Sequence, residues 1–86
     1  MWHVYVIQHN VTNQMYIGKT KDFKRRIAEH NNGLQSATKR KFGEWVPIYL
    51  ETYRDKKDAD NRELRLKNHG RAKQELFKRI KNSFIA

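Results

Sequence analysis

The chain has no cysteine, one proline and few acidic residues, and each shortage limits what the protein can be. Without cysteine there are no disulfides and no cysteine-ligated zinc sites, which permits an intracellular protein. The amino-terminal residues lack a basic region followed by a long apolar stretch, so we expect no secretory signal. No apolar run is long enough to cross a bilayer. We therefore expect a cytoplasmic protein with no membrane partner.

Positive charge is the most abundant chemical feature. The 86 residues contain 19 Lys and Arg against 9 Asp and Glu, a net charge of +10. A basic surface can simply keep a protein soluble, but an excess of this size in a small chain favours a polyanionic partner, nucleic acid before membrane. Hydrophobic residues make up 37%, which is enough for a packed core. We expect one domain over residues 1–86.

The first twenty residues predict a β-hairpin. Residues 2–7 are apolar and either β-branched or aromatic, which is typical of a strand buried on both faces. Polar turn residues occupy 9–14, and residues 15–17 form a second short strand. If the two strands pair so that Tyr5 lies opposite Tyr16, both side chains share one face of the sheet.

The rest of the chain predicts three helices and one further strand. Phe23 and Ile27 recur at helical spacing, with Thr20 as a plausible N-cap and Asn32-Gly33 as a stop. Residues 45–53 predict a strand in which Pro47 must lie near the start or on an edge. Two more helices follow, at about 55–69 and after Gly70; the last carries an apolar ridge of Ala72, Leu76, Ile80 and Phe84.

This order of elements, β-β-α-β-α-α, predicts an α+β fold. A hairpin and one more strand, covered by helices, indicate a small antiparallel sheet. No glycine-rich phosphate-binding loop follows a strand, so the sequence indicates neither a Rossmann unit nor a P-loop.

Arg26 and His30 lie four residues apart on the first helix and therefore project from the same side. A guanidinium can contact a phosphate through two hydrogen bonds and stabilise the charge of a phosphoryl transition state. An imidazole can transfer a proton near neutral pH. The alternative is an ordinary surface pair on a basic helix.

Glu63 shares a helix face with the apolar residues Ala59 and Leu66. A carboxylate there needs a partner. A salt bridge to Arg26 or Lys67 would provide one. The functional alternative is a Mg²⁺ or Mn²⁺ ion held by this carboxylate, water and substrate phosphate, and bound weakly without substrate.

Tyr5 and Tyr16 can hold or move a proton if nearby cations favour the ionised phenol, although core packing explains either residue equally well. A group of basic and polar residues could bind the phosphate backbone or could simply be solvated. These candidates are Lys19, Arg25, Thr38, Lys39, Arg40 and Lys41.

Together these residues resemble the signatures of the GIY-YIG endonuclease superfamily. Tyr16-Ile17-Gly18 reproduces the second signature, and His3-Val4-Tyr5 keeps the tyrosine of the first but not its glycine. The stretch 18–30 resembles the family's helix with its arginine and histidine, and Arg62-Glu63 resembles the place of its metal-binding glutamate. The resemblance covers residues 2–67 and selects Arg26 over Arg25 as the catalytic arginine.

The resemblance implies a three-stranded antiparallel sheet flanked by helices and a metal-dependent hydrolysis of DNA. In that reaction Tyr5 would be the proton acceptor, assisted by Tyr16 and His30, while Arg26 would stabilise the transition state and Glu63 would hold the metal. Some members of the family carry a further histidine where this chain has Thr38 and Lys39. The chain resembles the small, single-domain members of the family.

The sequence therefore predicts a divalent-metal-dependent DNA endonuclease that nicks one strand per active site. Repair, restriction and mobile-element roles all fit this activity. The alternative is a catalytically inactive module that uses the same basic face to bind DNA or RNA with a steep salt dependence and no metal. A protein-interaction adaptor fits the charge least well.

Overall fold

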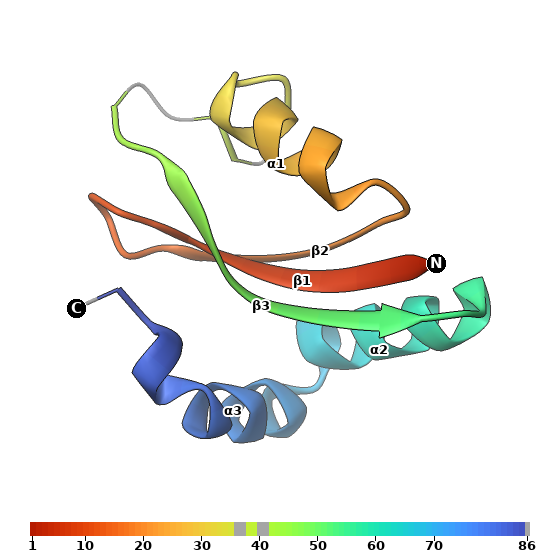
Figure 1. The fold of residues 1–86 in the computed structure, drawn as a ribbon. Coiled ribbons are helices and arrows are strands. Elements are labelled where there is room, and N and C mark those ends of the chain that lie inside the picture. The colour runs from red at the N-terminus through yellow and green to blue at the C-terminus, as the bar shows by residue number, and fades with distance from the viewer. Residues whose placement is uncertain (36–37, 40–41, 86) are drawn as a thin grey trace.

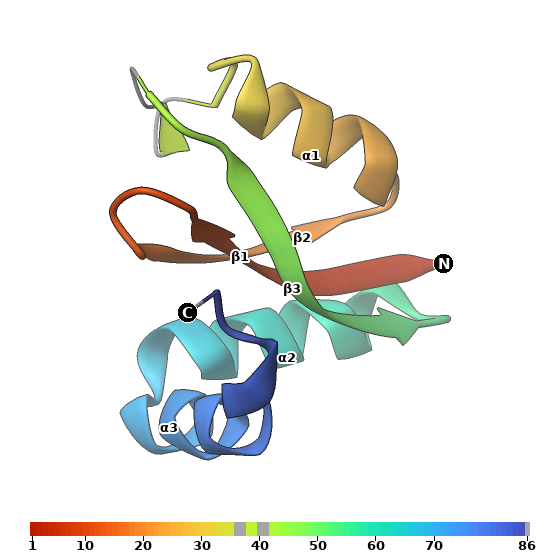
Figure 2. The same cartoon turned by 60° about the vertical axis from the view of Figure 1, so that its left-hand side comes forward.

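The fold has two layers of helix with a small sheet between them (Figure 1). It is known from a computed structural model that describes residues 1–35, 38–39 and 42–85. Helix α1 (Phe23–Asn31) lies on one face of the sheet. Helices α2 (Lys56–Asn68) and α3 (Gly70–Arg79) lie on the other face, and Figure 2 shows the same arrangement after rotation. The short 3-10 helix η2 (Lys81–Ser83) follows α3.

The sheet confirms the α+β class and its three antiparallel strands. Its order is β2 (Met15–Thr20), β1 (Trp2–His9) and β3 (Trp45–Tyr53), so β1 is central. Alternate side chains of β1 point to opposite faces. Val4 and Val6 pack with Leu66 and Leu76 in the core beneath α2 and α3, whereas Tyr5 packs on the α1 side.

The register of the hairpin differs from the pairing considered in the sequence. Tyr5 lies opposite Gly18, and Tyr16 lies opposite Ile7. The hairpin is therefore centred one residue later than in that pairing, and inside the turn the imidazole of His9 accepts hydrogen bonds from the backbone N–H groups of Val11 and Thr12. Positions 5, 7, 16 and 18 still share one face, and the rings of Tyr5 and Tyr16 lie 6.5 Å apart, centroid to centroid.

Gly18 is required by the Tyr5 side chain. A methyl group at position 18 would overlap the hydroxyl and the ring of Tyr5. We expect Gly18→Ala to lower the free energy of unfolding by about 1–3 kcal/mol, the usual cost of overpacking, and to displace the ring. Urea denaturation measures the loss. The control is Gly70→Ala, because a methyl group there meets no atom within 4 Å; an unchanged or raised stability is expected for it. Equal effects at both positions would contradict the steric reading.

The N-cap of helix α1 lies two residues later in the sequence than expected. Asp22, not Thr20, is the N-cap, and its carboxylate accepts a hydrogen bond from the backbone N–H of Arg25. Thr20 ends β2 instead, and its hydroxyl bonds to the backbone of Asp22. The stop at Asn32-Gly33 is confirmed, since Asn32 is the C-cap and Gly33 has a φ of 70°.

The remaining elements follow the predicted pattern closely. Pro47 lies on the edge strand β3, next to an irregularity where the pairing with β1 shifts between Val6 and Ile7. Leu76 of α3 and the C-cap residue Ile80 are buried in the core, and Ala72 and Phe84 pack against them. Helix α3 ends at Arg79, so Ile80 and Phe84 of the predicted ridge lie beyond it. No helix in the described ranges is long and apolar enough to cross a membrane.

Candidate active site

A buried chain of hydrogen bonds joins β1, α1 and the segment before β3. The hydroxyl of Tyr5 lies 2.8 Å from Nε2 of His30, and Nδ1 of the same imidazole lies 2.6 Å from Oγ1 of Thr38. The Thr38 hydroxyl also donates to the backbone carbonyl of Gln35 at 3.3 Å. All three side chains are at most 2% exposed. The geometry is therefore protected from bulk water.

The donor and acceptor of each hydrogen bond in this series follow from the bond between Thr38 and the Gln35 carbonyl. Because Thr38 donates its proton to a carbonyl, its oxygen accepts from His30, which places the imidazole proton on Nδ1. Nε2 is then the acceptor and Tyr5 the donor. The arrangement leaves His30 neutral and ready to take the Tyr5 proton at Nε2.

Burial, more than nearby charge, controls the acidity of the Tyr5 phenol. Desolvation raises its pKa well above the ordinary value of 10, and the charges of Tyr16 and Glu63 raise it further, while Arg26 lowers it. The cations of the protein alone are therefore not enough to favour the ionised phenol. Tyr5 is a neutral phenol and needs an acceptor for its own proton.

His30 supplies that acceptor because it is held in its neutral state. Burial lowers its pKa below 6.5, and the positive charge of Arg26 lowers it further. Protonation of His30 therefore costs more in the folded than in the unfolded protein.

This shift predicts an acid-sensitive fold. Below the unfolded pKa of about 6.5 the unfolded chain binds more protons, so stability falls as the pH drops from there toward the folded pKa. We expect the urea midpoint to decrease between pH 7 and pH 5, and His30→Gln to flatten this dependence. The control is His69→Gln, an exposed histidine on the helix boundary. An equally steep decrease in the His30→Gln protein would contradict the assignment.

Tyr16 lies beside these hydrogen-bonded side chains, and its hydroxyl is not part of their hydrogen bonds. Its ring packs edge-on against His30 at 5.1 Å between centroids. Its hydroxyl makes no hydrogen bond to any residue in the described ranges. The Nζ atom of Lys67 lies 5.6 Å from the centre of the same ring. Lys67 comes from α2, on the opposite face, and reaches this ring because β2 is an edge strand.

Glu63 lies at the same edge of the sheet. One carboxylate oxygen is 3.3 Å from Lys67 Nζ, and the other is 4.0 Å from Lys19 Nζ. The side chain keeps 21% of its surface exposed. Its negative charge acts on the Tyr5 phenol. The salt bridge to Lys67 considered in the sequence therefore exists, and Glu63 is near the hairpin rather than across the molecule.

Arg26 is placed between the helix surface and the buried phenol. Its Nε is buried, lies 3.5 Å from a carboxylate oxygen of Glu29, and makes no well-aligned hydrogen bond. Its two Nη groups make no hydrogen bond to any residue that the structure describes. Arg26 does not pair with Glu63. The guanidinium therefore retains donors for a ligand, and its charge reaches both Tyr5 and His30.

The predicted backbone-binding residues have different positions. Arg25 is exposed on α1 and lies 3.8 Å from Glu29, and Lys39 is exposed after Thr38. Lys19 is largely covered and paired with Asp60. Thr38 differs from the expectation, because it is fully buried against His30 and cannot reach a surface phosphate. Arg40 and Lys41 lie outside the described residues.

Sequence reasoning missed three supporting contacts. Thr38 was considered only as a surface residue, although a hydroxyl eight residues after His30 is the kind of group that fixes a tautomer. The indole N–H of Trp45 donates to the Thr38 carbonyl at 2.7 Å and so anchors this segment. The contact of Lys67 with Tyr16 was only weakly indicated by the sequence: Lys67 follows Glu63 by one helical turn and therefore lies on the same side of α2.

Comparison with known proteins agrees with this geometry. The model of the GIY-YIG catalytic domain matches residues 1–76. The chain belongs to the GIY-YIG family. It is 37% identical over 77 residues to a UPF0213 protein of Halobacterium salinarum, which covers 90% of this chain and 99% of that protein. It is 36% identical over 67 residues to a UPF0213 protein of Desulfotalea psychrophila, covering 77% and 60% respectively. No solved structure matches the chain.

Membership of the GIY-YIG family implies a nuclease, a hydrolase whose substrate is nucleic acid. GIY-YIG nucleases generally depend on a divalent metal. Among the described residues no group of three or more His, Cys, Asp or Glu side chains is placed to hold a metal ion. A metal here would therefore depend on few protein ligands.

Proposed function

We propose that this GIY-YIG protein is a divalent-metal-dependent DNA endonuclease that nicks one strand per active site. The observation that carries the proposal is the buried Tyr5–His30–Thr38 chain, together with the charges of Arg26 and Glu63 that act on Tyr5. Acid–base groups beside a guanidinium and a carboxylate are the components of phosphodiester hydrolysis.

Proton transfer would follow the hydrogen bonds. As the attacking water loses a proton to Oη of Tyr5, the phenol passes its own proton to Nε2 of His30. The imidazolium that forms keeps its Nδ1–H hydrogen bond to Oγ1 of Thr38, and this bond holds the ring in place. Tyr5 thus never needs to exist as an isolated phenolate, in accord with its raised pKa. The exposed part of Tyr16 would help to position the water.

Arg26 would stabilise the charge on the phosphate. Its Nη groups can donate to two oxygens of the scissile phosphate as negative charge builds up in the transition state. Its position one turn before His30 puts the guanidinium on the side of α1 from which the proton is removed. Arg25 and Lys39 would contact neighbouring phosphates, and Lys19 would do so only after release from Asp60.

Glu63 is the candidate ligand for a divalent ion. A single, partly exposed carboxylate suits Mg²⁺, which usually keeps several waters and binds one or two carboxylates and the substrate phosphates. When bound, such an ion supplies an acidified water and neutralises phosphate charge. Lys67 and Lys19 share the carboxylate in its absence, so both would turn toward phosphate oxygens on binding.

Nicking of supercoiled plasmid tests the proposed function. Purified protein should convert it to the open circle with Mg²⁺ or Mn²⁺, and chelator should stop the reaction. A protein that binds DNA in chelator but cuts no plasmid, flap, junction or single strand under any metal condition would overturn the proposal. That result would favour the inactive binding module instead.

The metal-ligand assignment predicts a changed metal requirement. We expect Glu63→Gln to raise the Mg²⁺ concentration for half-maximal nicking by roughly tenfold or more, because the carboxylate charge is lost. The control is Asp58→Asn, which removes one exposed carboxylate from the first turn of the same helix. Metal titration of the nicking rate measures both. An unchanged half-maximal concentration for Glu63→Gln would show that the ion is held elsewhere.

A further inference from the structure

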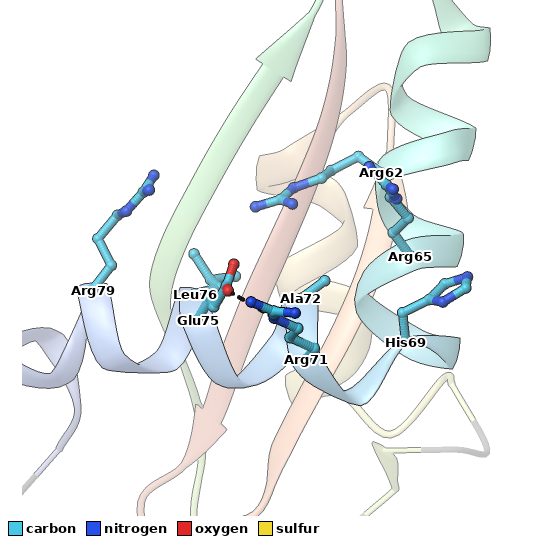
Figure 3. A pocket seen from close by; sticks show the side chains of 8 residues that line it. All are labelled: Arg62, Arg65, His69, Arg71, Ala72, Glu75, Leu76 and Arg79. Atoms are coloured by element: carbon cyan, nitrogen blue, oxygen red, sulfur yellow. Dashed lines mark hydrogen bonds and ion pairs between the residues drawn. The ribbon is translucent and has the colours of Figure 1, made fainter.

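A second concentration of charge lies on the opposite face of the sheet from His30, between α2 and α3 (Figure 3). The hollow has a volume of about 440 Å³. Eight residues line it: Arg62, Arg65, His69, Arg71, Ala72, Glu75, Leu76 and Arg79. We call this the arginine pocket. It holds four of the eight arginines of the chain and no lysine, although lysines outnumber arginines in the sequence.

The choice of arginine points to phosphate. A guanidinium presents a planar fork that matches two oxygens of a phosphate, whereas an ammonium acts as a point charge. Four guanidinium groups against the carboxylates of Glu75 and of Glu51, which binds Arg62, leave two net positive charges around the hollow. The beginning of α3 adds to this, because its N-cap His69 makes no capping bond and its first turn carries no acidic side chain.

Two of the four arginines are already held by carboxylates. Arg62 donates from Nε to both oxygens of Glu51 at 3.0 Å, and Nη2 lies 2.9 Å from the same carboxylate. Glu51 also accepts from Tyr49 and Tyr53, so this end of the pocket is rigid. Arg71 lies 3.2 Å from Glu75 on the exposed surface of α3. These two set the walls of the pocket.

The other two arginines have no such partner. Neither the Arg65 nor the Arg79 guanidinium forms a hydrogen bond or ion pair with any residue in the described ranges. Figure 3 shows them on different helices, Arg65 on α2 and Arg79 at the end of α3. Their donors remain available for an anion that enters the hollow.

We propose that the arginine pocket binds phosphate groups of a single-stranded segment that continues past the candidate active site. The inference rests on the proposed nucleic-acid substrate but not on cleavage. Helix α2 carries Glu63 at the β2 edge and Arg62 and Arg65 toward α3, so a strand passes from one to the other by bending around a helix about 10–12 Å wide. Duplex DNA, with a persistence length of about 150 base pairs, is too stiff for that path.

Binding in the presence of chelator, which prevents cutting, tests the pocket. The pocket variant is Arg65→Gln with Arg79→Gln. The control is Arg54→Gln with Lys78→Gln, which removes the same two charges from exposed positions outside the pocket. Fluorescence anisotropy is measured with a blunt duplex and with the same duplex carrying a single-stranded overhang, between 50 and 200 mM salt. Urea midpoints verify that both variants are folded.

For the overhang substrate we expect the pocket variant to bind about tenfold more weakly, and its salt slope to fall by roughly 1.5. The affinity of the control variant for the overhang substrate should fall by about twofold or less. For the blunt duplex, the pocket variant and the control variant should show the same small loss of affinity. Equal losses in the two variants, or no loss in the pocket variant, would overturn the site. Equal weakening on blunt duplex would overturn the single-strand assignment. If the unmodified protein binds neither substrate, the proposed function itself fails.

Discussion

Replacing Tyr5 with phenylalanine should lower the nicking rate by about 10²–10⁴, because the change removes the proton donor to His30 and leaves the ring in place. The Tyr5 ring packs against Phe23 and over Gly18, and phenylalanine keeps these ring contacts. The protein should therefore stay folded and keep its DNA affinity. Single-turnover nicking at saturating Mg²⁺ isolates the chemical step.

The matched control for this change is Tyr49→Phe. Tyr49 also uses its hydroxyl in a hydrogen bond, to Glu51 at 2.6 Å, but lies on β3 away from His30. The Tyr49→Phe protein should therefore lose little activity.

His30 must be neutral to accept the proton. The nicking rate of the unmodified protein should therefore fall only below the lowered pKa of His30, on the acid side of 6.5. Full activity in the Tyr5→Phe protein would show that the buried phenol is structural.

Replacing Arg26 with glutamine should lower the nicking rate by about 10²–10³, the usual effect of deleting one donor to transition-state charge. The loss should appear mainly in the rate at saturating DNA, because the charge matters most when the phosphate becomes more negative. The stability of the protein should change little, because the partner of Arg26 is Glu29, at 3.5 Å, and that pair is partly exposed.

Arg25→Gln provides an unusually close control. Arg25 is the neighbouring residue, carries the same charge and also approaches Glu29, at 3.8 Å, but 66% of its side chain is exposed. We expect it to weaken DNA binding modestly and to leave the chemical step within a few-fold of the unmodified protein. Rate losses of similar size in the two variants would mean that only the overall charge of α1 matters.

The sequence could predict the elements whose signals are local. The β3 strand was expected at residues 45–53 and runs from Trp45 to Tyr53, because its apolar and aromatic residues are bounded by polar ones on both sides. The end of α1 was equally clear, since Gly33 tolerates the positive φ that follows the helix. Its start was not, because Thr20 and Asp22 are both good caps and only the end of β2 decides between them.

The features that escaped depend on contacts between distant segments. The hairpin register is one such feature: the imidazole of His9 accepts two backbone hydrogen bonds inside the turn, and no residue pattern in the sequence predicts those bonds. The pKa of Tyr5 depends on how deeply the phenol is buried, which the sequence does not give. The arginine pocket requires α3 to fold back on α2, and Arg65 and Arg79 are fourteen residues apart in the sequence.

The alternation along β1 ties the chemistry of this protein to the length of one strand. Val4 and Val6 fill the core while Tyr5 between them faces His30. Inserting or deleting a single residue between Tyr5 and the hairpin turn would turn the phenol into the hydrophobic core and a valine toward the active site. A change in the length of a loop or of the last helix leaves this alternation intact, whereas a one-residue change within β1 reverses it.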